Sequence, residues 1–103
     1  MASSKSYLVF VLDQLHDLEG LTYRAMMGEY ILYYKGKIFG GIYDDRLLIK
    51  PVKAALSMMP SATYALPYES AKEMLLVENL EDSAFLVKLV DAMFDELPAP
   101  KKK

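Results

Sequence analysis

The sequence predicts a two-layer α+β domain in which an antiparallel sheet carries helices on one side. Two observations predict this fold class. Between Thr22 and Lys50, three apolar, aromatic-rich runs are separated only by Lys35-Gly36 and by Asp44-Asp45, and such separators have the length of a tight hairpin loop. Apolar residues at helical spacing lie before this stretch and after it. The expected order is a helix, four strands, a helix, two strands and a helix.

The first helix is expected to begin after Ser3 or Ser4, because serine side chains cap helix N-termini. It is expected to end at Gly20, because glycine accepts the left-handed conformation of a C-terminal cap. Val9 and Phe10 are expected to widen its buried face. The main buried stripe comprises the apolar residues at helical spacing, which are Leu8, Val11, Leu12 and Leu15.

The four strands that follow are expected at residues 21–27, 29–34, 37–43 and 46–50. In the second of these, the alternation of a strand places Tyr30 and Tyr34 on one face and Tyr33 on the other. The third strand contains Gly40 and Gly41, and paired glycines weaken a strand unless something packs closely over the backbone. A helix is therefore expected to cross the sheet at this point.

The second half of the chain is expected to hold a helix at residues 52–59, strands at 63–66 and 74–77, and a last helix. Pro51 suits the first turn of the short helix, and Pro60 stops it. Asn79 is expected to cap the last helix, where Glu81 and Asp82 favour the positive end of the helix dipole. The buried stripe of the last helix comprises Leu86, Leu89, Val90, Met93 and Leu97.

The composition favours a single domain with its own core. The chain has 103 residues, of which 53% are hydrophobic and 25% are charged. Such a chain buries roughly two-thirds of the surface that its unfolded form exposes. We expect one domain at residues 1–97 and a disordered proline-lysine tail at residues 98–103. The absence of cysteine excludes disulfides, thiolate nucleophiles and cysteine-ligated metals.

Charge and hydropathy narrow the classes of partner. The formal net charge is −2, whereas dedicated nucleic-acid binders usually have a clear basic excess, so direct nucleic-acid binding is not expected. No apolar run approaches the ~20 residues that span a bilayer. The short run at residues 7–12 is followed closely by acidic residues, unlike a signal peptide. A cytoplasmic protein without a membrane contact is expected.

No group of residues in the sequence predicts catalysis. His16 is the only histidine, and we expect it to be solvated near a helix end, because a catalytic triad or a metal site needs partners that its sequence neighbourhood lacks. The adjacent Asp44 and Asp45 suit a hairpin turn. The glycines form neither a GxGxxG nor a GxxxxGK[ST] motif. We expect no enzymatic activity, no cofactor and no metal.

Five segments carry a resemblance to a known family: Thr22-Tyr23-Arg24, Met26-Met27-Gly28-Glu29-Tyr30, Tyr34-Lys35-Gly36-Lys37, Asp45-Arg46-Leu47-Leu48-Ile49-Lys50 and Pro67-Tyr68-Glu69. In order and spacing they resemble the N-terminal domain of the TfoX/Sxy family of bacterial competence regulators, over about residues 3–97. The resemblance implies a two-layer α+β fold similar to that of secretion chaperones. It also implies positive control of competence genes together with another transcription regulator. Full-length members of the family look like two-domain proteins, and we expect the helical C-terminal domain to be missing here.

The leading hypothesis is a non-enzymatic protein-interaction module, with a transcription regulator as a candidate partner. The family-like segments supply the candidate interaction residues, which are Arg24, Glu29, Tyr30, Tyr34, Lys50 and Tyr68. The planar fork of arginine suits recognition of a carboxylate, while a structural ion pair is the competing explanation for Arg24 beside Glu29. An exposed patch of tyrosine and methionine would favour a protein partner. Unprotected sheet edges would favour a homodimer.

The alternative hypothesis is a sensor of a small anionic ligand. In that hypothesis Arg24 and Lys50 lie near each other and hold the ligand against the strand tyrosines, so a deep pocket lined by these residues would favour it. A third hypothesis is DNA binding through Lys53, Lys72 and the lysine tail, and the acidic balance of the chain argues against it. The sequence names neither the partner nor the ligand.

Overall fold

The computed structural model describes residues 4–26, 28–67, 71–78 and 80–97, which form three α-helices, six strands and one 3₁₀ helix. The helices are α1 (Lys5–Gln14), α2 (Lys53–Met58) and α3 (Ser83–Met93), and the 3₁₀ helix η1 (Phe94–Glu96) follows α3. The strands are β1 (Leu21–Met26), β2 (Glu29–Tyr34), β3 (Lys37–Ile42), β4 (Leu47–Ile49), β5 (Tyr64–Ala65) and β6 (Met74–Val77). This order of α-helices and strands is the one that the sequence predicts.

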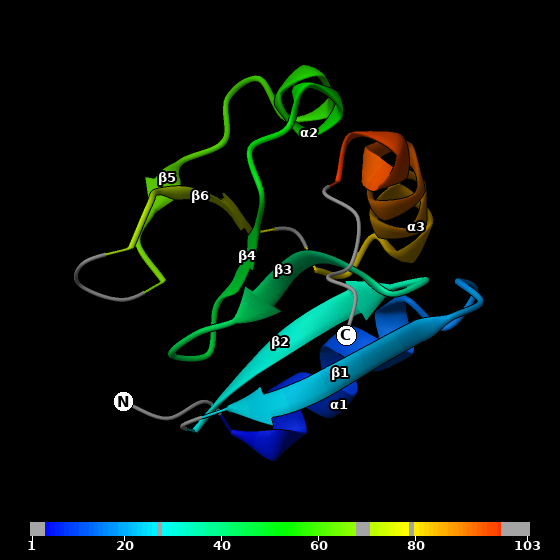
Figure 1. Ribbon diagram of the computed structural model, residues 1–103, viewed down its shortest axis with the longest axis vertical. Coiled ribbons are helices and arrows are strands. Elements are labelled where there is room, and N and C mark those ends of the chain that lie inside the picture. Colours follow the sequence, from blue (N-terminus) through cyan, green and yellow to red (C-terminus); the bar gives the residue numbers. More distant parts are fainter. Residues whose placement is uncertain (1–3, 27, 68–70, 79, 98–103) are drawn as a thin grey trace, which may run out of the picture.

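The six strands form one antiparallel sheet with the order β1-β2-β3-β4-β6-β5. The first four strands make a meander, and β6 returns beside β4 with β5 outside it (Figure 1). The two edges of the sheet are therefore β1, which is six residues long, and β5, which is two residues long. The α+β class with an antiparallel sheet is confirmed.

The helices and one face of the sheet share a single hydrophobic core. Figure 1 shows α1 behind β1 and β2 in this view. The largest buried side chains of the core come from every layer: Leu8, Leu15, Leu32, Phe39, Ile42, Leu47, Ile49, Leu75, Leu86, Leu89 and Met93. Burying one such side chain contributes about 1.5–3 kcal/mol, so this core holds the two layers together. On α1 the stripe is narrower than expected, because Val9 and Phe10 are exposed.

The hairpin turns form where the sequence predicts them. Lys35 and Gly36 both have positive φ, as do Asp44 and Asp45, which is the backbone of a two-residue type I′ turn. Around the second turn, the amide of Tyr43 donates to the carbonyl of Arg46 at 2.9 Å, and the reverse bond is 3.1 Å long. Glycine and aspartate tolerate positive φ better than most residues, so local chemistry favours the turn at Asp44-Asp45. In the first turn only Gly36 has this tolerance, and Lys35 adopts a φ of 51° without it.

The ends of two helices differ from the expectation. Ser4 caps α1 as predicted, because its hydroxyl accepts from the amide of Tyr7 at 3.2 Å. However, α1 ends at Gln14, and Gly20 instead begins the β1–β2 hairpin, where its carbonyl accepts from the amide of Lys35. The last helix is capped by Asp82, whose carboxylate accepts from the amide of Phe85 at 3.1 Å. The expected cap, Asn79, lies outside the described residues.

No helix crosses at the paired glycines; the close neighbours there are strand backbone and one ring. A Cβ atom at Gly40 would lie 2.2 Å from the carbonyl oxygen of Leu48, and one at Gly41 would lie 2.7 Å from the ring of Tyr43. The reason is a β-bulge: Leu32 pairs with Gly40 and Tyr33 pairs with Ile38, so Phe39 is an extra residue in β3. A bulge sharpens the local twist, and β4 approaches β3 too closely for a side chain at residue 40.

Candidate protein-interaction surface

The register of the sheet assigns each strand residue to one of two faces, because partners in an antiparallel ladder point the same way. One row of partners comprises Tyr23, Leu32, Gly40, Ile49 and Leu75. Its leucines and isoleucine belong to the core under the helices. The adjacent row comprises Arg24, Ile31, Gly41, Leu48 and Leu76. This second row therefore lies on the face away from the helices, which we call the open face.

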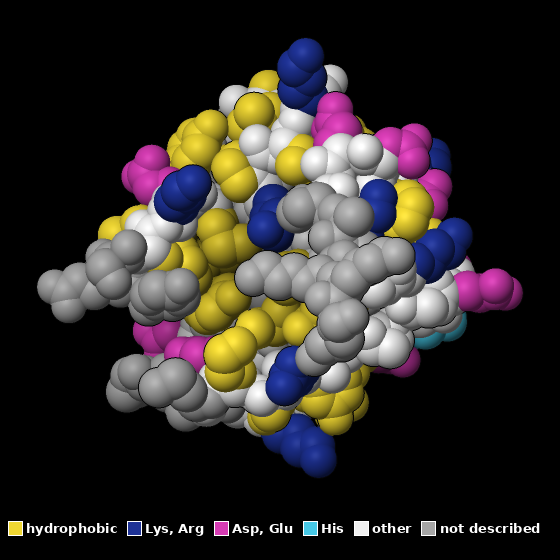
Figure 2. Space-filling model, in the orientation of Figure 1, with side chains coloured by type: hydrophobic (Ala, Val, Ile, Leu, Met, Phe, Trp, Pro, Cys, Tyr) yellow, Lys and Arg dark blue, Asp and Glu magenta, His cyan; other side chains and the backbone are white. Residues whose placement is uncertain are grey.

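The open face is largely apolar. Within the described residues its apolar side chains are Met26, Ile31, Tyr33, Ile38, Tyr43, Leu48, Ala65, Met74 and Leu76. Met26 is exposed, Leu48 is fully buried, and the others are half-buried. Figure 2 shows hydrophobic side chains gathered in a hollow on this side of the molecule, with both basic and acidic side chains around it. A sheet face that is open on one side is usually lined by polar residues, so the apolar side chains here distinguish this face from an ordinary solvent-facing one.

A groove of about 490 Å³ lies at one end of the open face. Ile38, Tyr43 and Met74 are apolar residues of its lining. Pro67, which precedes β6 in the chain, also lines the groove. Lys50, Lys72 and Glu73 are the charged residues of this lining. The described lining therefore combines an apolar surface with a net charge of +1.

Three predicted interaction residues lie on the open face, but they are not clustered. Arg24 is exposed on the edge strand β1, while Lys50 lines the groove beyond β4. Three strand spacings separate β1 from β4, which is about 14 Å, so the structure does not bring Arg24 and Lys50 together. Glu29 accepts from the amide of Asp44 at 3.1 Å and so connects two hairpin turns. The expected proximity of Arg24 and Lys50 is wrong, because three strand spacings separate β1 from β4. Arg24 and Glu29, in contrast, are diagonal neighbours on the open face, since Arg24 pairs with Ile31 and Glu29 pairs with Met26.

The predicted interaction residues Tyr30 and Tyr34 lie on the helix side of the sheet. Tyr34 is only 4% exposed, and its hydroxyl donates to Asp91 Oδ1 at 2.9 Å. Burial, followed by this hydrogen bond, raises the pKa of Tyr34 above its ordinary value. Tyr30 is half-buried and makes an edge-to-face contact with Tyr23, with 5.9 Å between ring centroids. Tyr34 is therefore a packing residue that joins β2 to α3. The remaining predicted interaction residue, Tyr68, lies outside the described residues.

Sequence reasoning missed most of the groove. Ile38 and Met74 in its lining, and Leu76 beyond it on the open face, have no motif that marks them, and only the register places them on one face. The period-2 alternation within β6 was a usable signal, because Met74 and Leu76 alternate with the buried Leu75 and Val77. No local signal places Pro67 beside β3 and β4.

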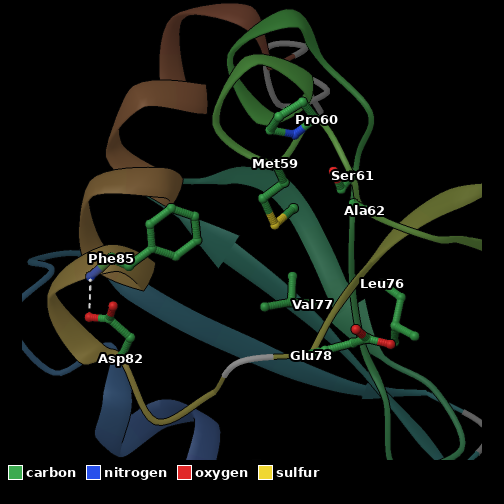
Figure 3. Close-up of a pocket in the computed structure, with 9 residues that line it drawn as sticks. All are labelled: Met59, Pro60, Ser61, Ala62, Leu76, Val77, Glu78, Asp82 and Phe85. Carbon is green, nitrogen blue, oxygen red and sulfur yellow. Dashed lines mark hydrogen bonds between the residues drawn. The ribbon is translucent and has the colours of Figure 1, made fainter.

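Two smaller hollows of about 370 Å³ each lie elsewhere on the described surface. One lies beside Tyr34 and Asp91 and has Lys35 and Lys88 in its lining. The other lies between the end of β6 and the start of α3 (Figure 3). Neither contains the predicted interaction residues Arg24 or Lys50.

The structure places His16 at the surface. Its Nδ1 atom is 2.6 Å from the carbonyl oxygen of Asp13, and its Nε2 atom is 3.2 Å from Asp17 Oδ1. The carbonyl contact first, and the Asp17 carboxylate second, raise the pKa of His16. In the described ranges, no three His, Cys, Asp or Glu side chains are grouped as metal ligands, and no helix is long and apolar enough to cross a membrane.

The fold defines the class of protein: a small two-layer α+β domain built on a six-stranded antiparallel sheet. The chain belongs to the TfoX N-terminal domain family, whose model matches residues 13–92. It is also 32% identical, over 104 residues, to an uncharacterized 12.7 kDa protein in the trpE 5′ region of Spirochaeta aurantia, and this match covers 100% of the chain and 90% of that relative. No solved structure matches the chain. The resemblance that the sequence carries is thus confirmed at the level of the family.

Proposed function

We propose that this protein is a non-enzymatic interaction module that binds a partner protein on the open face of its sheet. One observation carries the proposal: a contiguous apolar face, including Ile31, Ile38 and Leu76, lies on the side of the sheet away from the described helices. Burying such side chains against a partner yields about 25 cal/mol for each Å² of apolar surface. These three side chains are half-buried, and none of them belongs to the hydrophobic core of the domain.

The partner that fits this face presents an apolar segment with an acidic flank. Lys50 and Lys72 line the groove, and Arg24 stands at the far edge of the same face. Glu73 is the opposing charge, so an acidic residue on the partner gains most beside Lys50. Charges at the rim steer association and orient the partner, while the apolar centre supplies most of the affinity.

The resemblance to competence regulators supports a transcription regulator as the partner and the cytoplasm as the place of action. In this proposal the domain is a transcription-regulatory accessory protein that acts through protein contact rather than by binding DNA itself. The net charge of −2 supports this assignment, because phosphate neutralisation requires a basic surface.

The geometry disfavours the ligand-sensor alternative in its original form. Arg24 lies on β1 and Lys50 follows the end of β4, and three strand spacings of about 14 Å in all separate these strands. Tyr30 and Tyr34 point to the opposite face of the sheet. No described pocket has both cations in its lining. The four residues therefore cannot surround one small anion.

A homodimer is a separate proposal that rests on the exposed edge strand β1. Five of its six residues are exposed, and an edge of this length can pair with a second copy. A two-fold axis through Tyr23 would place Arg24 opposite Thr22, whereas an axis through Arg24 would place two arginines opposite each other, so the first register is favoured. Sedimentation equilibrium tests the proposal: we expect a concentration-dependent dimer, and a monomer at all concentrations would exclude it.

Affinity capture from a lysate of the source cells tests the proposed function, with nuclease treatment and a moderate-salt wash. The wild-type protein is compared with Ile38→Lys on the open face and with Val9→Lys on the exposed side of α1. Both variants add one lysine, and circular dichroism checks that both fold. We expect Ile38→Lys to reduce recovery of a stoichiometric partner at least tenfold, as for a central interface residue, and Val9→Lys to leave it unchanged. Equal recovery by all three proteins would refute docking on the open face.

A further inference from the structure

The hollow at the start of α3 is apolar at its centre. Figure 3 shows Met59 and Phe85 facing Val77 across it. The connection after α2 supplies Met59, β6 supplies Val77, and α3 supplies Phe85, so three elements build a space of about 370 Å³. All three elements contribute to the hydrophobic core or pack against it, so the core holds the residues at the base of the hollow in place.

The rim of this hollow is acidic. Glu78 and Asp82 are both exposed, and Figure 3 shows them on either side of Val77. In the described lining these are the charged residues, and no lysine or arginine accompanies them. Glu81, which is also exposed, precedes Asp82 in the sequence. The hollow therefore carries the opposite charge to the groove on the open face.

The two rim carboxylates are not equivalent. Asp82 Oδ1 accepts from the amide of Phe85 at 3.1 Å and caps α3. The N-terminus of a helix carries roughly half a positive elementary charge, which offsets part of the charge of Asp82. Glu78 lies on the other side of the hollow, beyond the last residue of β6, and makes no described hydrogen bond or ion pair. Glu78 is therefore the stronger anchor for a cation.

We propose that this hollow is a second docking site, which binds a basic polypeptide segment of a partner. An apolar side chain of that segment sits among Met59, Val77 and Phe85. A lysine or arginine beside it pairs with Glu78, and a second basic residue on the other side approaches Asp82. The charge of the rim excludes acidic segments, so this site and the open face select different sequences. The inference does not depend on the proposed function of the open face.

An NMR titration of the ¹⁵N-labelled full chain tests the proposal, with the peptide acetyl-Lys-Lys-Leu-Lys-Lys-amide as the probe. We expect the amide signals of Val77, Glu78 and Phe85 to shift. A peptide with glycine in place of leucine should bind at least about tenfold more weakly, because it has no apolar side chain to bury. A peptide with glutamate in place of every lysine should not bind.

A pair of protein variants distinguishes an effect of the rim carboxylate of Glu78 from an effect of the overall charge of the protein. Glu78→Gln should weaken binding of the leucine peptide about two- to fivefold, which is the range of an exposed ion pair. Glu19→Gln makes the same charge change at an exposed residue outside the hollow, and it should leave the affinity unchanged.

Four results would overturn the proposal. The first is equal binding of the glycine peptide, and the second is shifts confined to the groove of the open face around Ile38, Tyr43 and Met74, which shares no lining residue with this hollow. The third is equal weakening by both glutamine variants, and the fourth is shifts of the same three amides on dilution of the protein alone. The last result would assign the hollow to a second copy of this chain.

Discussion

Replacing Gly40 by alanine tests the close approach of β3 and β4 that shapes the open face. The new Cβ atom would lie 2.2 Å from the carbonyl oxygen of Leu48 and 2.9 Å from Cα of Ile49, whereas a relaxed C···O contact is about 3.3–3.6 Å. Both atoms are backbone, so no side-chain rotation relieves the clash, and β4 must move by about 1 Å. Overpacking costs about 1–3 kcal/mol, and each weakened ladder hydrogen bond adds about 1 kcal/mol. We therefore expect Gly40→Ala to lower the free energy of unfolding by about 3–4 kcal/mol.

Urea denaturation measures this loss. With a slope of about 1.5 kcal/mol per molar urea, the midpoint should fall by about 2 M. Ser57→Ala, at an exposed position of α2, is the control and should change the free energy of unfolding by less than about 0.5 kcal/mol. A midpoint for Gly40→Ala within about 0.3 M of the wild-type value would show that the two strands are not this close.

Three further predictions concern caps and titrating groups. Thermal denaturation should show that Asp82→Ala lowers the free energy of unfolding by about 1 kcal/mol, because α3 loses its N-terminal cap. Asp82→Asn should lower it much less, because asparagine also caps helices. Tyr34→Phe should cost about 1 kcal/mol by removing the bond to Asp91. Because the pKa of Tyr34 is raised by burial, its contribution to stability is complete below the ordinary pKa of 10 and is lost as pH rises through the folded-state pKa. The free energy of unfolding of the phenylalanine variant should therefore decline less steeply at high pH. An unchanged decline would contradict this prediction. An NMR titration should place the pKa of His16 above 6.5 and show that Asp17→Asn lowers it, since the contacts with the Asp13 carbonyl and the Asp17 carboxylate favour the protonated ring. The stabilising effect of these contacts is complete below pH 6.5 and is lost above the raised pKa. An unchanged pKa of His16 in Asp17→Asn would contradict the assignment.

Turns and element order could be predicted because their causes are local. Gly36, Asp44 and Asp45 are residue types that accept positive φ, and the flanking runs have strand periodicity. Likewise, Ser4 could be identified as a cap from its own chemistry. At the last helix, several polar residues were suitable, and the geometry of residues 80–82 selected Asp82. Because several neighbouring residues have side chains that can cap a helix, residue type alone does not predict which of them caps α3.

The candidate surface could be predicted only in part, because faces are assigned by distant contacts. The alternation in β2 correctly separates Tyr34 from Tyr33, but it does not say which face the helices cover. The bulge at Phe39 then shifts the register by one residue, so the row that holds Arg24 crosses Gly41 and Leu48 instead of Gly40 and Ile49. The reason for the paired glycines was likewise non-local, since the backbone of β4 occupies the space beside Gly40 and the carbonyl oxygen of Tyr30 in β2 occupies the space beside Gly41.

Site-specific photocrosslinking in the source cells tests the central claim most directly. Benzoylphenylalanine replaces Tyr33, which is half-buried on the open face, or Phe10, which is 39% exposed on α1. Both exchanges keep an aromatic side chain, so the fold should tolerate each. Docking on the open face predicts one discrete crosslinked partner from residue 33, lost when Lys50→Glu is added, and none from residue 10. The same partner from residue 10, or none from residue 33, would contradict it.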